Sequence, residues 1–191
     1  DAVDETPGRY TNQSEYARGG IGRVLLVHDQ HLGREIAMKE LLPFTDYVDE
    51  SMKLEKSPVR QSMALVTRFL QEARVTGQLE HPSIVPVYEL GRRRDGTLYY
   101  TMKLVRGRTL ASAIREAATM PNRLALLSHF VDLCQAIAYS HSRRVIHRDI
   151  KPSNVMVGKF GETVVLDWGL AKVKDKKDDA ASQMEETLKT L

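Results

Sequence analysis

Apolar and polar positions alternate over the first part of this chain, and this pattern predicts β-strands. We expect strands at residues 16–29, 34–42, 84–90 and 98–105, the first of them interrupted by a glycine turn. The turn Arg94-Asp95-Gly96 joins the last two strands. Residues 1–14 are polar and lack periodicity, so we predict a loose lead-in there.

Helical spacing of apolar residues appears in three other segments, 63–79, 109–116 and 122–142. In the first, one face is formed by Leu65, Phe69, Ala73 and Thr76, and His81-Pro82 ends the helix. In the last, the residues expected to face a core are Leu124, Leu127, Val131, Cys134 and Tyr139.

The remaining segments are connections and one hairpin. Residues 43–62 contain Pro43, Pro58 and many charges, which favours an insertion or irregular connection. Residues 155–157 and 163–166 predict a hairpin around Gly158 and Gly161, and from Lys172 onward the chain is charged and expected to be mobile. Strands followed by helices indicate an α+β protein with two layers or lobes.

Composition narrows the class of protein. The 191 residues suffice for one ordinary domain, and the net charge of +3 is spread along the chain, which argues against a nucleic-acid partner. The single cysteine, Cys134, excludes an internal disulfide and suits a reducing compartment, and its apolar surroundings predict a small buried side chain. No run approaches the roughly 18 apolar residues of a membrane span.

Two features of the strand region suggest phosphate binding. Gly19, Gly20 and Gly22 lie between two strands, where backbone amides can approach a phosphate, although a plain hairpin turn fits equally well. Lys39 ends an apolar strand. It is either a solvent-facing edge residue or a phosphate-binding cation that needs an acidic partner. Glu72 is the candidate for that partner, and a surface charge pair is its alternative interpretation.

The strongest motif is the run His147-Arg148-Asp149-Ile150-Lys151-Pro152-Ser153-Asn154, followed by Asp167-Trp168-Gly169. It places a proton acceptor, a cation and two candidate magnesium ligands in one short stretch, which is the set that phosphoryl transfer requires. The order and spacing resemble the catalytic and metal-binding loops of eukaryotic-type (Hanks-type) protein kinases.

This resemblance implies a two-lobed protein-kinase-like fold, the cofactors ATP and Mg2+, and a role for each residue of the motif. Asp149 would accept or orient the proton of the attacking hydroxyl, and Lys151 would neutralise charge on the transferred phosphate. Asn154 and Asp167 would bind magnesium. The Lys39–Glu72 pair would hold the α- and β-phosphates, and His147 would pack beneath the site with Trp168.

The resemblance also implies a nucleotide-binding surface. The family pattern G-x-G-x-x-G-x-V fits here with Ala17 in place of its first glycine, and residues 100–107 resemble the hinge between the lobes. Met102 would lie at the back of the adenine pocket, and the backbones of Lys103 and Val105 would bond the adenine edge. The full set of implied contacts is Ala17, Gly19, Gly20, Gly22, Val24, Ala37, Lys39, Met102, Lys103, Val105 and Met156.

Details of the motif point to the substrate and to regulation. Lys151 in the form H-R-D-x-K-P-x-N resembles serine/threonine kinases, so the implied partners are ATP and a protein carrying Ser or Thr. A dimer for trans-autophosphorylation is a further arrangement that the family allows. Arg148 would bind a phosphate on the activation segment. The candidate acceptors Ser182, Thr187 and Thr190 are equally compatible with plain polar loop positions.

By this resemblance residues 1–14 are a flexible lead-in, 15–105 the small lobe with the ATP-binding loop, and 106–191 a partial large lobe ending in the activation segment. We therefore expect a fragment of a longer bacterial kinase, cytoplasmic, whose parent could be membrane-anchored outside this segment. A second hypothesis is a nucleotide-binding, catalytically inactive pseudokinase-like interaction module. The intact motif residues favour the enzyme, whereas the lack of later large-lobe helices favours inactivity of the segment.

Overall fold

The computed structural model describes residues 2–19, 21–43 and 58–173, and they form two compact units. Among the described residues, one unit contains those up to 73 together with 87–104, and the other contains 74–86 and 105–173. The division after residue 104 lies one residue before the predicted lobe boundary. The segment 74–86, which the sequence predicts in the small lobe, groups with the second unit.

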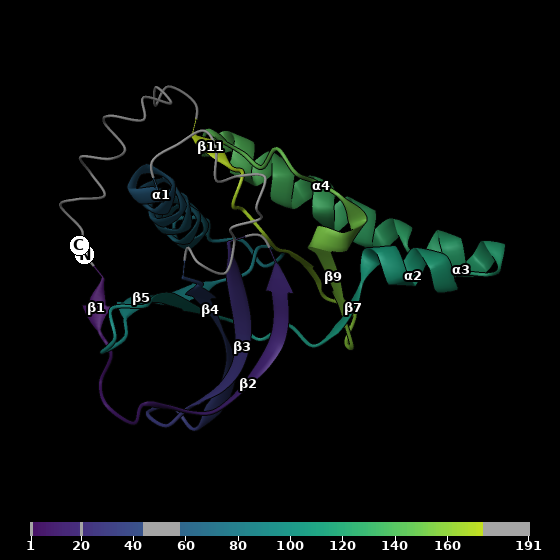
Figure 1. The fold of residues 1–191 in the computed structure, drawn as a ribbon. Coiled ribbons are helices and arrows are strands. Elements are labelled where there is room, and N and C mark those ends of the chain that lie inside the picture. The colour runs from purple at the N-terminus through teal and green to yellow at the C-terminus, as the bar shows by residue number, and fades with distance from the viewer. Residues whose placement is uncertain (1, 20, 44–57, 174–191) are drawn as a thin grey trace. The chain divides into compact units, whose positions relative to one another are not determined.

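The first unit is built on a six-stranded sheet in the order β1-β5-β6-β4-β3-β2 (Figure 1). Its strands are β1 (Val3–Asp4), β2 (Tyr10–Gly19), β3 (Gly22–Asp29), β4 (Arg34–Leu41), β5 (Val87–Arg92) and β6 (Leu98–Met102). All neighbours are antiparallel except β1 and β5, which are parallel. The β5–β6 turn forms at Gly96, whose φ of 88° suits glycine.

Helix α1 (Pro58–Gly77) packs on one face of this sheet. Phe69, Leu70 and Ala73 of the helix are buried against Leu98 and Tyr100 of β6, and of these Phe69 and Ala73 lie on the predicted face. The opposite face is a second cluster, formed by Tyr10, Leu25, Val27, Ile36, Met38 and Tyr99. Successive residues of a strand point to opposite faces, so β4 and β6 contribute to both clusters.

Two predicted segments of this unit have the wrong bounds. The lead-in at residues 1–14 is not loose throughout, because β1 lies at Val3–Asp4 and β2 begins at Tyr10, a residue that is 4% exposed. The irregular connection does not extend to residue 62, because the helix begins at Pro58. Proline lacks only a hydrogen bond that the first helical turn does not need. Most of the predicted insertion, residues 44–57, lies outside the described residues.

The second unit combines helices with short strands. Its elements are α2 (Leu110–Glu116), α3 (Met120–Ala125), α4 (Leu127–Ser142), the pair β8 (Val145–Ile146) and β11 (Lys172–Val173), and the sheet β10 (Thr163–Val165), β9 (Val155–Gly158), β7 (Gly107–Thr109). Thr109 caps α2, because its side chain accepts the Ser112 N–H at 3.1 Å. The predicted hairpin is β9–β10. The predicted mobile tail is wrong for Lys172 and Val173, which pair with β8.

The predicted helix over 122–142 is two helices, separated at Leu126, and its core face is different from the predicted one. Leu133, Ala136 and Ser140 of α4 are buried, and Tyr139 packs partly buried beside them. The other residues predicted to face the core are exposed: Leu124, Leu127, Val131 and Cys134. Helix α4 has two apolar stripes, and the one that contains Leu133 and Ala136 packs against the described core.

No helix in the described part of the chain is long and apolar enough to cross a membrane.

Candidate active site

Lys39 of β4 and Glu72 of α1 form an ion pair, with 2.5 Å between Nζ and Oε1. Their side chains are only 14% and 3% exposed. The Tyr100 hydroxyl donates to the same Glu72 oxygen at 2.8 Å. A pair removed from water in this way persists only when further hydrogen bonds compensate the lost hydration. Tyr100 supplies one, so the Lys39 ammonium is held at a defined place on the sheet.

Strand register brings apolar residues to the sheet face that carries Lys39. Val24 of β3 lies opposite Lys39, and Ala17 of β2 lies opposite Val24. Ala37 lies two residues before Lys39 and pairs with Met102 of β6. Residues paired across antiparallel strands, and residues two apart in a strand, share a face. This arrangement puts an apolar surface beside a cation, which suits a ligand with a flat ring and anionic groups.

The glycine turn joins β2 and β3, with Gly19 opposite Gly22. A Cβ on Gly22 would lie 2.4 Å from the backbone oxygen of Glu40, so Gly22 is required by the close approach of β3 and β4. A Cβ on Gly19 would meet no described atom within 4 Å. Gly20, the third glycine of the predicted phosphate loop, lies outside the described residues.

In the second unit, Asp149, Lys151 and Asn154 form one hydrogen-bonded group. Lys151 Nζ donates to Asp149 Oδ2 at 2.7 Å, and Asn154 Nδ2 donates to Oδ2 at 3.1 Å and to the Asp149 backbone oxygen at 3.0 Å. The Lys151 hydrogen bond lowers the pKa of Asp149, and the same bond raises the pKa of Lys151. Asp149 is therefore a carboxylate at neutral pH, with Oδ1 directed at neither partner.

His147 links this group to Asp167. It is 1% exposed, and burial lowers its pKa. Its Nδ1 accepts the Asp149 backbone N–H at 3.3 Å, so we assign the proton to Nε2, which donates to the Leu166 carbonyl at 3.1 Å. Its ring also packs against the Trp168 indole, with the centroids 4.5 Å apart, as predicted. His147 thus contacts both residues that flank Asp167, Leu166 through a hydrogen bond and Trp168 through its ring.

Asn154 and Asp167 suit the predicted magnesium ligands in chemistry. Asn154 is 8% exposed, and its amide nitrogen is committed to Asp149, so its amide oxygen points elsewhere. Asp167 has a φ of 58°, a conformation that Asp tolerates. Within the described ranges no group of three His, Cys, Asp or Glu side chains could hold a metal by itself. One carboxylate and one amide oxygen fit an ion that is also held by phosphates, the usual arrangement for Mg2+.

The other predicted contact residues lie in or beside strands. Met156 of β9 is buried, and so is Val105, while Lys103 is exposed. Arg148 has a φ of 67° and donates from Nε to the Leu170 carbonyl at 2.5 Å. Its predicted phosphorylated partners, Ser182, Thr187 and Thr190, lie outside the described residues.

Comparison with known proteins places these features in a family. The chain matches the protein kinase domain over residues 10–189. The chain belongs to the protein kinase family. It is 39% identical over 170 residues to the serine/threonine-protein kinase PknD of Protochlamydia amoebophila, which covers 83% of this chain and 16% of that protein. The corresponding kinase of Chlamydia abortus is 35% identical over 172 residues, covering 85% and 17%. The kinase of Chlamydia caviae is 33% identical over 187 residues, covering 93% and 18%.

Membership in the protein kinase family and the α+β kinase fold, both predicted from the motifs, are thereby confirmed. The kinase chain spans about a sixth of the length of these curated relatives, all of them bacterial.

Some partners in this kinase chain were not predicted from its sequence. One is Tyr100, whose position in the alternating strand 98–105 would place it on the Lys39 face. Another is a polar group on the second unit: Thr163 Oγ1 donates to Asp132 Oδ2 at 2.8 Å and lies 2.8 Å from His129 Nδ1. The i,i+3 spacing of His129 and Asp132 places both on one side of α4, which was the available signal.

Proposed function

We propose that the protein containing this kinase chain transfers the γ-phosphate of ATP to serine or threonine hydroxyls of proteins. The observation that supports it most directly is the hydrogen-bonded group of Asp149, Lys151 and Asn154. It combines a carboxylate of lowered pKa, a cation and a neutral amide oxygen within one loop.

In this proposal Asp149 accepts the proton of the attacking hydroxyl through its carboxylate, or orients that hydroxyl toward the phosphorus. Lys151, already bonded to Asp149, stabilises the charge that spreads over the transferred phosphoryl oxygens. The proton moves from the substrate hydroxyl to Asp149, and the bond between the γ-phosphorus and the β,γ-bridging oxygen breaks as the new phosphorus–oxygen bond forms.

The remaining residues would bind the nucleotide and the metal. Lys39, held by Glu72, would pair with the α- and β-phosphates. Asn154 and Asp167 would hold Mg2+, which neutralises phosphate charge when bound. The adenine ring would lie on the apolar surface of Ala17, Val24, Ala37 and Met102, with Met156 beside it and its edge bonded to the backbones of Lys103 and Val105.

Several finer points belong to the same proposal. The form of the Lys151 motif and the names of the relatives favour Ser/Thr over Tyr as acceptor. The two compact units would be the small lobe and the first part of the large lobe. A cytoplasmic location and a dimer for trans-autophosphorylation are included as implications of the family. The intact Lys39–Glu72 pair and Asp149 group favour an enzyme over the inactive nucleotide-binding module.

The test is transfer of labelled γ-phosphate to a serine/threonine protein substrate by the full-length protein. Asp149→Asn keeps the size of the side chain but removes the proton acceptor, and we expect kcat to fall by about 100- to 10,000-fold. Asp95→Asn is the matched control, because Asp95 lies in the β5–β6 turn and accepts the Thr97 N–H. Equal transfer by wild type and Asp149→Asn would exclude the assigned role.

A further inference from the structure

Residues 3–9 run between the two outer strands of the sheet in the first unit, and we call them the N-terminal strap. Strand β1 of the strap pairs with β5, with Val3 opposite Gly91, and the Glu5 N–H donates to the Arg92 carbonyl at 2.9 Å. At the other end, the Arg9 carbonyl accepts the Gln30 N–H at 2.8 Å. Because β1 and β2 are the two outer strands of the sheet, the strap joins one edge of the sheet to the other.

Arg93, just after β5, is the centre of the contacts beneath the strap. Its guanidinium donates to Glu5 Oε2 at 3.2 Å, to Gln13 Oε1 at 3.0 Å and to the Met38 sulfur at 3.1 Å, and it also donates to Glu40. The Arg93 side chain is 16% exposed. One side chain therefore connects the strap, β2 and β4.

Glu40 is the residue that connects this cluster to the candidate site. Its side chain is 3% exposed, and its carboxylate is held by Arg93 and, at 2.9 Å, by Arg23. Glu40 directly follows Lys39, and neighbouring residues of a strand point to opposite faces. Two guanidinium groups thus hold β4 on one face while Glu72 holds Lys39 on the other, so the rotation of the strand about its axis is set from both sides.

We infer that Arg93 is a positioning residue for Lys39, acting through Glu40, and that Glu5 of the N-terminal strap holds Arg93 for this task. The inference rests on the proposed function, in which Lys39 binds the α- and β-phosphates of ATP. The strap is then part of the nucleotide-binding apparatus, although it contributes no contact to the nucleotide.

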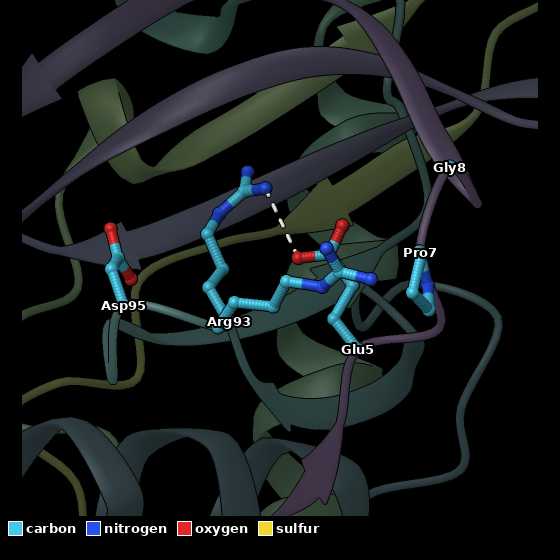
Figure 2. A pocket seen from close by; sticks show the side chains of 6 residues that line it. Glu5, Pro7, Gly8, Arg93 and Asp95 are labelled. Atoms are coloured by element: carbon cyan, nitrogen blue, oxygen red, sulfur yellow. Dashed lines mark hydrogen bonds and ion pairs between the residues drawn. The ribbon is translucent and has the colours of Figure 1, made fainter.

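The surroundings of the Glu5–Arg93 pair permit a mild test. Figure 2 shows Glu5 and Arg93 joined across a pocket, with Pro7 and Gly8 at one side and Asp95 at the other. The pocket has a volume of about 330 Å³. A water molecule occupies about 30 Å³, so several fit beside the pair. Glu5→Gln removes the charge where water can replace the lost contact, and we expect this variant to stay folded.

The experiment is isothermal titration calorimetry of the full-length protein with Mg-ATP and, separately, with adenosine, which has no phosphates. The variants are Arg93→Met, Glu5→Gln and Lys39→Met, with circular dichroism to confirm the fold of each. Arg92→Met is the matched control, because Arg92 also pairs with the strap, through Asp4 at 3.1 Å, but that carboxylate is 81% exposed. Such an exposed pair contributes little.

We expect Arg93→Met and Glu5→Gln to weaken Mg-ATP binding by about three- to tenfold and to leave adenosine binding unchanged. Lys39→Met should show the same selective loss. Arg92→Met should bind both ligands like the wild type. Unchanged Mg-ATP affinity in Arg93→Met, or an equal loss for ATP and adenosine, would overturn the positioning role. If the wild type bound neither ligand, the proposed function would be refuted, and the inference that rests on it would be refuted too. The wild-type titration alone shows this result, so it is distinguishable from a failure of the positioning role.

Discussion

The Nδ1 atom of His147 accepts the backbone N–H of Asp149 at 3.3 Å, which requires that nitrogen to be unprotonated. Because Nε2 donates to the Leu166 carbonyl, the neutral imidazole satisfies both partners and the imidazolium satisfies only one. Burial of His147 also lowers its pKa in the folded state, because the charged form would lose its hydration.

This relationship predicts how stability depends on pH. Above the unfolded pKa of about 6.5, His147 is neutral in both states and contributes no pH dependence. As the pH falls below that value, His147 binds a proton in the unfolded chain but stays neutral in the folded state. The free energy of unfolding therefore falls, by at most about 1.4 kcal/mol per pH unit.

The measurement is urea unfolding of wild type and His147→Gln between pH 7.5 and pH 5, a range that spans the titration of an ordinary histidine. We expect the difference in unfolding free energy between the two proteins to shrink as the pH falls. A difference that stayed constant across this range would contradict the buried neutral imidazole.

Removal of the Tyr100 hydroxyl should weaken the hold on Glu72. Tyr100→Phe loses one hydrogen bond to a charged group, and Tyr99→Phe loses another, the 2.9 Å bond to Glu89 on the opposite face of the sheet. Each should reduce the free energy of unfolding by about 1–3 kcal/mol. Only Tyr100→Phe should also weaken Mg-ATP binding in a titration, and equal binding by the two variants would exclude this role of Tyr100.

Loss of Glu72 should be more costly than loss of its tyrosine partner. Glu72→Ala leaves the largely buried Lys39 ammonium without its carboxylate, and removing one partner of a buried pair costs about 3–5 kcal/mol. The double variant Glu72→Ala/Lys39→Met should recover part of this stability, because no unpaired charge remains. Urea unfolding of Tyr100→Phe, Glu72→Ala and the double variant gives the comparison, and a double variant less stable than Glu72→Ala would contradict the explanation.

Thr163 should stabilise the second unit through its hydroxyl rather than its methyl group. Thr163→Val keeps the shape but removes the contacts to Asp132 and His129, so we expect a loss of about 1–3 kcal/mol. Thr163→Ser keeps the hydroxyl and should retain most of the polar contribution. Thermal unfolding of both variants decides between them, and a valine variant as stable as wild type would show that this polar group contributes nothing.

The sequence alone predicts the parts of the fold in which local pattern and tertiary packing agree. Phe69 and Ala73 lie on the apolar stripe of α1 and are buried. Helix α4 differs, because Leu127 and Val131 form the more apolar stripe but are exposed, while Ala136 and Ser140 are buried. The buried stripe of α4 also contains Leu133, so both stripes carry apolar residues, and a hydrophobicity pattern alone does not decide which of them packs against the core.

The N-terminal strap was not predicted, for a different physical reason. Its contacts depend on polar pairs far apart in the sequence, such as Glu5 with Arg93. Residues 1–9 have no periodic pattern that predicts such pairs. The catalytic motif was predicted because its residues lie close together in the sequence. The contact between Tyr100 and Glu72, by contrast, can be predicted only once the strand register is known.

Trp168 is the only tryptophan in the sequence, and it directly follows Asp167. Its indole is 1% exposed, packs against His147, and has no hydrogen-bond partner for Nε1 among the described residues. The tryptophan fluorescence of this chain, excited selectively over its seven tyrosines, therefore comes from one buried ring beside the predicted metal ligand. Any rearrangement of that loop would be visible as a change in emission, without a label or an engineered reporter.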